Sequence, residues 1–144
     1  MNVYLAAKYS RREEMEKLAA DLPSVGMECV ARWVYGGEEG LTRPEIATLD
    51  LNDVTRADVC IVFTHPRGEP QPGGGRFVEF GYAMALGNRC IVIGPIENVF
   101  CETPGVERYD DWKSFLEIEA VSNRESQKRA SARLGGKAER FDVV

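Results

Sequence analysis

The sequence has no long hydrophobic run, one histidine and four cysteines among its 144 residues. No stretch approaches the roughly 20 apolar residues that a membrane-spanning helix requires, and the first apolar run is too short for a secretory signal. The cysteines occur singly, and three lie in apolar segments, which is typical of small buried side chains in a reducing compartment. We therefore expect a cytoplasmic protein that has no contact with a membrane and needs no disulfide or metal to fold.

The scarcity of histidine and the sign of the charge also limit the chemistry. His65 and scattered cysteines form no metal-ligand pattern, and they give no support to a Ser-His or Cys-His nucleophile pair. The formal net charge of −5 argues against a nucleic-acid polymer as the main partner, because proteins that follow a phosphate backbone concentrate Lys and Arg. We expect a small-molecule ligand and no cofactor.

The length of the chain fits one domain, and an excess of basic residues distinguishes the last 24 residues from the rest. A chain of this length can bury an ordinary hydrophobic core. Residues 1–120 are predicted to form an α/β domain. Residues 121–144 contain almost no large apolar side chains and carry six basic residues against three acidic ones, which predicts a basic tail or one short surface helix.

Apolar periodicity predicts alternating strands and helices along residues 1–120. The expected strands are residues 2–7, 27–34, 58–65 and 89–95, and the expected helices follow Ser10, span 44–58, run through 75–87 and end the domain at 111–120. The third and fourth strands are apolar almost throughout, which indicates cover on both faces and hence a parallel sheet. We therefore predict a doubly wound, mostly parallel, flavodoxin-like (Rossmann-like) sheet of four to five strands, with the first strand beside the third.

This fold predicts where a ligand binds. In open α/β sheets, ligands lie beyond the carboxyl ends of the strands, at the point where the winding direction switches. The loops expected there are AAKYS after the first strand and THPRGEPQPGGGR after the third.

The segment 72–87 places one acid, Glu79, in an otherwise apolar helix that follows a glycine-rich loop. A carboxylate in the first turn could simply complement the helix dipole. Burial among aromatic side chains, however, is costly unless the group is paired, hydrogen-bonded or facing a wet pocket, and this one lies beside the expected ligand crevice. We favour a functional role for Glu79, since isolated acids in clefts are functional-site candidates.

The loop before that helix offers free backbone N–H groups, because Gly73, Gly74 and Gly75 provide no capping side chain. An anion such as a phosphate could bind there, with Arg76 or Lys8 as counter-charge. A plain flexible loop is the alternative reading. Both faces of the helix are apolar, which predicts cover by the sheet on one side and by a second subunit on the other, hence a homo-oligomer.

Two further residues come from neighbouring elements. Helical spacing puts Asp50 on the shoulder of the 44–58 helix, within reach of the crevice, and turns Asp53 further outward. A structural acid on a solvated flank explains Asp50 equally well. Trp33, expected at the carboxyl end of the second strand, is a candidate surface for stacking a base.

The segments VYLAA, LDLNDVTRADVCIVFT and GGGRFVEFGYAMALGNRCIVIGP together resemble the nucleoside 2-deoxyribosyltransferase family, which includes the 2'-deoxynucleoside 5'-monophosphate N-hydrolases. The resemblance covers roughly residues 2–116. It implies cleavage or exchange of an N-glycosidic bond through a covalent glycosyl-enzyme ester. By this resemblance Glu79 is the nucleophile, Asp50 the acid that protonates the departing base, and Tyr4 a partner that orients Glu79.

The resemblance also implies a shared site and a preference among substrates. Asn98 matches a position that enters the pocket of the neighbouring subunit. Gly73 stands where the transferases carry an acid and the nucleotide hydrolases a small hydroxyl residue, which favours a hydrolase acting on a monophosphate. The alternatives are a non-catalytic nucleotide-binding or sensor domain and an electron carrier on the same fold.

Overall fold

The computed structural model describes residues 1–65 and 74–141 of the chain. The strands are β1 (Asn2–Ala6), β2 (Glu28–Cys29), β3 (Val59–Phe63), β4 (Arg89–Ile93) and β5 (Glu107–Tyr109). The α-helices are α1 (Arg12–Ala19), α2 (Arg43–Arg56), α3 (Gly75–Ala85) and α4 (Trp112–Phe141). Short 3-10 turns are η1 (Tyr9–Arg11), η2 (Leu22–Val25), η3 (Arg32–Tyr35) and η4 (Val99–Glu102).

The five strands form one parallel sheet in the order β2-β1-β3-β4-β5. Tyr4 pairs with Cys60, and Cys60 pairs with Cys90, so β1, β3 and β4 form its centre. The predicted doubly wound fold, with the first strand beside the third, is confirmed. β5 follows the four strands expected from apolar runs, and its short sequence Glu107–Tyr109 has no such run.

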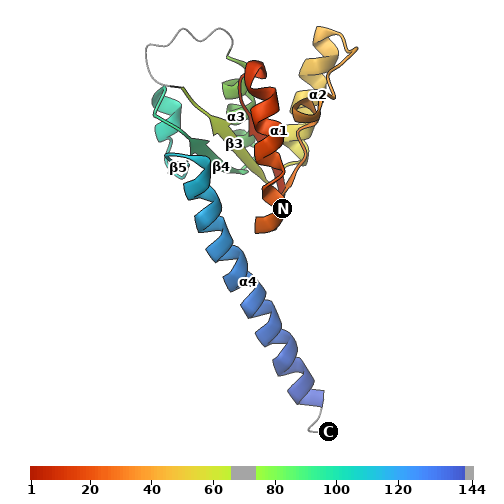
Figure 1. The fold of residues 1–144 in the computed structure, drawn as a ribbon, viewed down its shortest axis with the longest axis vertical. Coiled ribbons are helices and arrows are strands. Elements are labelled where there is room, and N and C mark those ends of the chain that lie inside the picture. Colours follow the sequence, from red (N-terminus) through yellow and green to blue (C-terminus); the bar gives the residue numbers. More distant parts are fainter. Residues whose placement is uncertain (66–73, 142–144) are drawn as a thin grey trace.

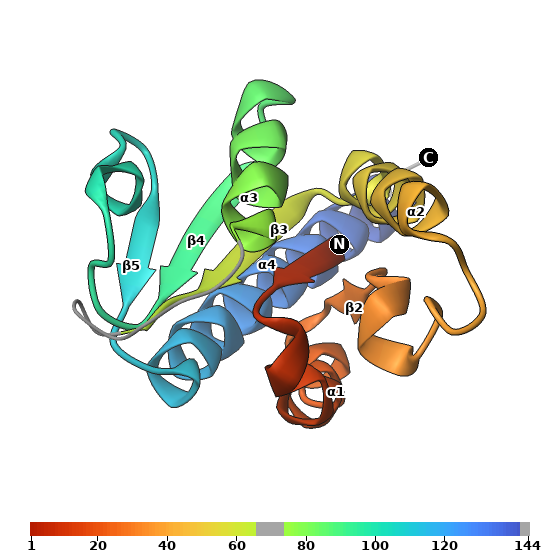
Figure 2. The ribbon, with the colours of Figure 1, turned by 90° about the horizontal axis from the view of Figure 1, so that it is seen from above.

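The sheet is covered on both faces, as its apolar central strands require. Figure 2 shows α2 and α3 on one side of the sheet and α1 and α4 on the other. Every residue of β3 is buried, and Phe80 of α3 and Phe115 of α4 are fully buried against the sheet from opposite sides. The carboxyl ends of β1 and β3 therefore emerge side by side where the winding switches direction.

The second strand is much shorter than the predicted 27–34. Only Glu28 and Cys29 pair with β1, and the chain then turns into η3, which holds Trp33. The indole Nε1 of Trp33 donates a hydrogen bond of 2.8 Å to the carbonyl of Leu5. This tertiary bond holds Trp33 against the end of β1 in a turn rather than a strand.

The start of α2 is fixed by local chemistry. The Thr42 side chain accepts a hydrogen bond from the Glu45 backbone N–H, and the Glu45 carboxylate accepts one from the Thr42 N–H, which is a capping box. Pro44 occupies the first turn, where its missing N–H has no cost. This defined start sets the rotation of α2, and with it the direction of Asp50.

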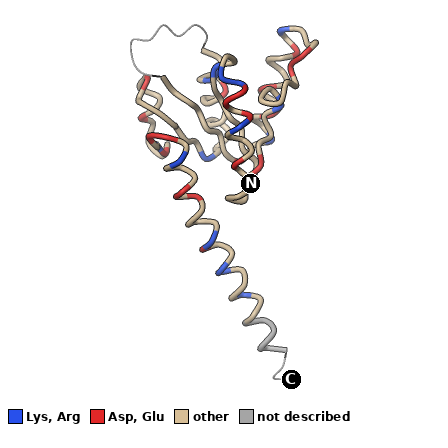
Figure 3. Tube along the Cα trace, viewed as in Figure 1, with Lys and Arg blue, Asp and Glu red and all other residues tan. Residues whose placement is uncertain are grey.

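Helix α4 is one unbroken element of 30 residues. It begins near the predicted position, but it continues past residue 120, where we expected a separate tail or short helix. Figure 1 shows α4 leaving the sheet and extending as a rod. Residues 124–135 are all exposed, and the charged positions along this part are mainly basic (Figure 3). No described helix has both the length and the apolar character needed to cross a membrane.

Candidate active site

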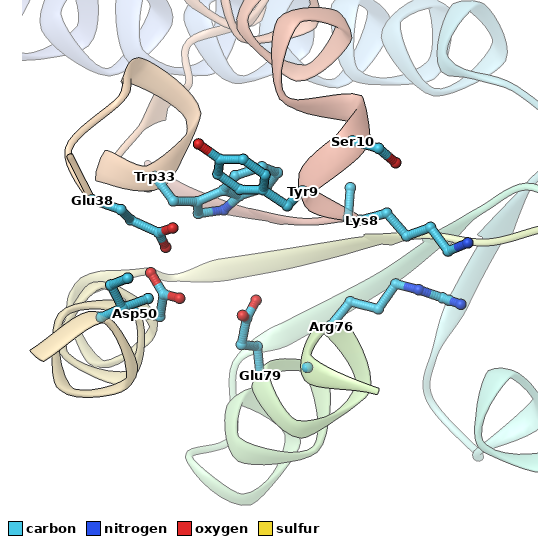
Figure 4. A pocket seen from close by; sticks show the side chains of 11 residues that line it. Lys8, Tyr9, Ser10, Trp33, Glu38, Asp50, Arg76 and Glu79 are labelled. Carbon is cyan, nitrogen blue, oxygen red and sulfur yellow. The ribbon is translucent and has the colours of Figure 1, made fainter. Parts of the chain in front are cut away.

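A pocket of about 410 Å³ lies at the carboxyl ends of β1 and β3, where the fold predicts a ligand. Its volume is within the range of ordinary small-molecule sites. The lining residues are Ala7, Lys8, Tyr9, Ser10, Trp33, Glu38, Ile46, Asp50, Gly75, Arg76 and Glu79. Figure 4 shows carboxylates at one end, Lys8 and Arg76 extending toward the other, and Glu79 between them.

Glu79 projects from α3 into this pocket, as expected from sequence. It lies on the fifth residue of the helix that begins at Gly75, so it sits in the second turn and not in the first. The simple helix-dipole role, which is confined to the first turn, is therefore weakened. Burial, followed by the nearby Asp50 and Glu38, raises the pKa of Glu79 to about 8, although the Tyr4 hydroxyl acts in the opposite direction.

Tyr4 lies on β1 beneath Glu79 and is fully buried. Its hydroxyl has no partner of good hydrogen-bond geometry among the described residues. Burial and then the charge of Glu79 raise the pKa of Tyr4 far above its ordinary value, so the phenol keeps its proton. A buried, protonated hydroxyl near Glu79 can donate to the carboxylate after a small adjustment.

Asp50 faces the pocket from α2, as expected from helical spacing. The prediction that Asp53 turns further outward is wrong. Asp53 is fully buried and accepts hydrogen bonds from the Arg32 backbone N–H and the Arg32 Nε, both at 2.9 Å. It turns inward because η3 packs against α2 and brings Arg32 over it. Asp50 has no such cation: its Oδ1 is buried without a partner in the part of the chain that the structure describes.

Glu38 is a site residue that sequence reasoning missed, since GGEEG was predicted only as a turn. Figure 4 shows its carboxylate facing that of Asp50. Gly36 adopts φ 80°, a left-handed conformation suited to glycine. A Cβ on Gly37 would lie 2.8 Å from the Arg32 carbonyl oxygen, so only glycine lets the loop pass this close. These two glycines hold Glu38 over the pocket.

The opposite end of the pocket is cationic. The Arg76 side chain is only 3% exposed, and its Nη2 donates to Glu97 at 2.6 Å. Its Nε and Nη1 are buried with no partner among the described residues. Burial, followed by Arg11, Arg76 and Lys8, lowers the pKa of His65, which locates three positive groups at this end.

The start of α3 adjoins these cations. Gly74 is its N-terminal flanking residue and makes no side-chain cap, and a Cβ on Gly74 or Gly75 would meet no atom within 4 Å. The backbone N–H groups of the first turn therefore border open space, and their dipole favours an anion. Gly73, the third glycine expected at the site, lies outside the described residues.

The aromatic wall of the pocket differs from the prediction. Trp33 lines the pocket but is only 4% exposed, since its indole is bonded to Leu5. Tyr9 is 65% exposed, and its ring centroid lies 6.4 Å from that of Trp33. The larger surface for stacking a base is thus Tyr9, with Trp33 behind it (Figure 4).

Asn98 does not line the pocket of its own chain. Its side chain accepts a hydrogen bond from the Phe100 N–H at 2.9 Å and so begins η4. The outer face of α3 exposes Val78, Tyr82 and Leu86, at 64%, 37% and 45%. An apolar hollow of about 350 Å³ continues from the pocket between α2 and α3 and includes Val78.

The pocket thus combines the Glu79 carboxyl group, two further acids, two cations beside an uncapped helix start, and an exposed aromatic ring. Within residues 1–65 and 74–141, no group of three or more His, Cys, Asp or Glu side chains is arranged to hold a metal ion. Acids at one end and cations at the other fit a polar small molecule that carries an anionic group.

No protein-family model and no curated protein matches the chain. Among solved structures, a CMP N-glycosidase from Clostridium botulinum is 20% identical, with a TM-score of 0.61, over 85% of this chain and 99% of that one. A 2-deoxyribosyltransferase from Bacillus psychrosaccharolyticus is 18% identical, with a TM-score of 0.64, over 81% and 90%. At these identities the similarity is one of fold, and the chain shares the fold of both proteins.

Proposed function

We propose that the chain is an enzyme that cleaves or exchanges the N-glycosidic bond of a 2'-deoxynucleoside or its 5'-monophosphate, with Glu79 as nucleophile. The observation that carries this proposal is the Glu79 carboxyl group inside the pocket, between the acids Glu38 and Asp50 and the cations Lys8 and Arg76. The two solved structures of the same fold support it, because one is a CMP N-glycosidase and the other a 2-deoxyribosyltransferase.

The proposed reaction has two steps. A carboxylate oxygen of Glu79 attacks C1' of the sugar, the C1'–N bond breaks with its electron pair on the base, and Asp50 gives its proton to the base. Water then bonds to C1', the ester bond breaks to restore the Glu79 carboxylate, and the proton released from water returns to Asp50. A second base in place of water gives exchange.

We favour hydrolysis of a monophosphate. Nε and Nη1 of Arg76 have no partner among the described residues, and together with Lys8 and the uncapped start of α3 they suit a phosphate group at the far end of the pocket from Asp50. A nucleotide bound in this direction presents its base to the acids and to Tyr9. The sequence resemblance adds Gly73 in place of the acid of the transferases.

We further propose that the enzyme works in the cytoplasm as a homo-oligomer. All four cysteines are free, which suits a reducing compartment. A second subunit on the exposed side chains of Val78, Tyr82 and Leu86 would cover the apolar hollow beside the pocket. The resemblance suggests that Asn98 of that subunit enters the site.

Base release tests the proposal. Purified protein is incubated with the four deoxynucleosides, their 5'-monophosphates and the corresponding ribonucleotides, with and without an acceptor base, and free base is measured. We expect release from at least one substrate and a loss of about 1,000-fold or more in Glu79→Gln. The exposed Glu28→Gln is the matched control. Tight nucleotide binding with no turnover, unchanged in Glu79→Gln, would instead support a sensor domain.

A further inference from the structure

Two acids from different elements meet at the base end of the pocket. Asp50 comes from α2 and Glu38 from the loop that Gly36 and Gly37 hold in place. Their carboxyl groups face each other in Figure 4, and both line the pocket. The Oδ1 of Asp50 is buried and has no hydrogen-bond partner within the described residues. A carboxylate pair in this position demands a proton or a cation.

Like charges in contact do not both ionise readily, so two adjacent carboxyl groups hold one proton between them over a wide pH range. Burial, followed by the contact with Glu38, raises the pKa of Asp50 to about 7. An ordinary aspartic acid is ionised at that pH and has no proton to give.

The surrounding charges favour retention of this proton. Acids approach from α2 and α3, and the phenol of Tyr4 stays neutral. Cations are present but belong to other parts of the site: Lys8 and Arg76 extend away from the pair in Figure 4. The other titratable groups beside the pair are Glu79, Asp53 and Tyr4. Glu39 and Arg12 line an adjoining hollow together with Glu38, and Arg43 lines one together with Asp50.

Resting on the function proposed above, we propose that Glu38 shares one proton with Asp50 and so acts as the positioning residue that keeps Asp50 ready to protonate the departing base. The proton moves from the Asp50 carboxyl group to the base as the C1'–N bond breaks, which leaves the pair doubly ionised. The attack of water on the sugar ester supplies the proton that restores it. General acid catalysis of this kind contributes about 10²- to 10⁴-fold to a rate.

The test is the pH dependence of kcat/KM for base release in wild type, Glu38→Gln and Glu28→Gln. Wild type is expected to give a bell: the rate rises as Glu79 ionises and falls as the pair loses its proton. In Glu38→Gln the amide no longer shares the proton, so the alkaline limb moves down by about one pH unit and kcat/KM on that limb falls about tenfold. Glu28→Gln, which removes the charge of an exposed side chain outside the pocket, is the matched control and should follow wild type.

A second substrate separates proton delivery from a general defect in folding or binding. A sugar that carries 4-nitrophenolate at C1' has a leaving group that departs without a proton. Glu38→Gln should cleave it at the wild-type rate, and Glu38→Asp should recover the alkaline limb with natural bases. Equal losses on both kinds of leaving group would contradict the proposal.

A titration that needs no turnover distinguishes a failure of the proton-sharing pair from a failure of the proposed function. Carbon-13 NMR of the Asp50 side chain should show titration near pH 7 in wild type and a shift toward its ordinary range in Glu38→Gln. If wild type releases base but Glu38→Gln changes neither the alkaline limb of kcat/KM nor the Asp50 titration, the proton-sharing pair is refuted while the function stands. If wild type releases no base although Glu38→Gln shifts the Asp50 titration, the proposed function fails and the proton-sharing pair remains.

Discussion

Asp50 and Asp53 lie one helical turn apart on α2, yet their surroundings are opposite. Asp53 is fully buried between two arginines, at 2.8 Å from Arg32 Nη2 and 3.3 Å from Arg56 Nη1. Asp50 has the acid Glu38 as its neighbour, and its Oδ1 has no partner among the described residues. One turn of helix thus separates an acid that is paired for stability from an acid that is left unpaired.

The same contrast holds across the sheet. At the amino end of β4, Arg89 donates to Glu107 at 2.6 and 2.7 Å and also to Glu119 of α4. At the opposite, carboxyl end of the sheet, Glu79 is half-buried and pairs with no cation among the residues that the structure describes. Acids that lose solvent without gaining a cation are costly. Within the described residues Glu79 and Asp50 are such acids, and both line the pocket, which is the pattern expected of a functional site.

The largest predicted effect on stability comes from Asp53, the acid that is paired with two arginines. Asp53→Asn removes the charge that accepts from Arg32 and Arg56, and we expect it to lower the free energy of unfolding by about 3 kcal/mol. Urea denaturation at pH 7 measures this. Asp58→Asn is the control: Asp58 is exposed and accepts one bond, from the Asn2 N–H at 2.8 Å, so its loss should cost about 1 kcal/mol or less. Equal costs would remove the contrast.

Arg76 tests the cationic end of the pocket. Arg76→Met removes the Nε and Nη1 groups proposed to bind phosphate, and kcat/KM for a 5'-monophosphate should fall about 100-fold, equivalent to about 2.7 kcal/mol. The corresponding nucleoside, assayed with the same variant, is the internal control and should lose little. A similar loss for both substrates would mean that Arg76 supports the fold, through Glu97, rather than the phosphate.

The smallest predicted effect is a gain in stability, opposite in sign to that of Asp53→Asn, and it depends on pH. Glu79→Gln should raise the free energy of unfolding at pH 8 by about 2 kcal/mol, since the amide needs no proton to stay buried. Below pH 4.5, wild-type Glu79 is protonated in both the folded and the unfolded states, and the gain should vanish. Between these limits the folded wild type holds a proton that the unfolded chain has lost, so its stability falls as the pH rises through about 8. Thermal unfolding at pH 4.5 and pH 8 checks this, and a gain independent of pH would refute it.

The sequence was sufficient for the sheet, because β3 and β4 are apolar along their whole length and only a doubly covered parallel sheet accommodates them. It was also sufficient to place Glu79, the one acid in an apolar helix, at the pocket. The sequence did not predict how early the second strand ends, because the apolar pattern continues through residue 34. The hydrogen bond from the Trp33 indole to the Leu5 carbonyl, which holds the chain in a turn there, is a tertiary contact.

The remaining errors have the same origin. Asp53 follows Asp50 by three positions, and helical spacing alone turned it toward solvent, but the η3 turn carries Arg32 over it. Glu38 lies in a segment whose glycines predict a turn correctly, yet nothing local indicates that the turn points an acid at Asp50. Partners brought from distant parts of the chain decide which acids are paired with a cation and which remain unpaired.

The projecting part of α4 has a practical consequence for work in solution. A helix of 30 residues is about 45 Å long at 1.5 Å per residue, and most of that length is beyond the sheet (Figure 1). Such a shape has more hydrodynamic drag than a sphere of equal mass. A single chain should therefore elute early from a gel-filtration column, and light scattering or native mass spectrometry is the suitable way to count subunits.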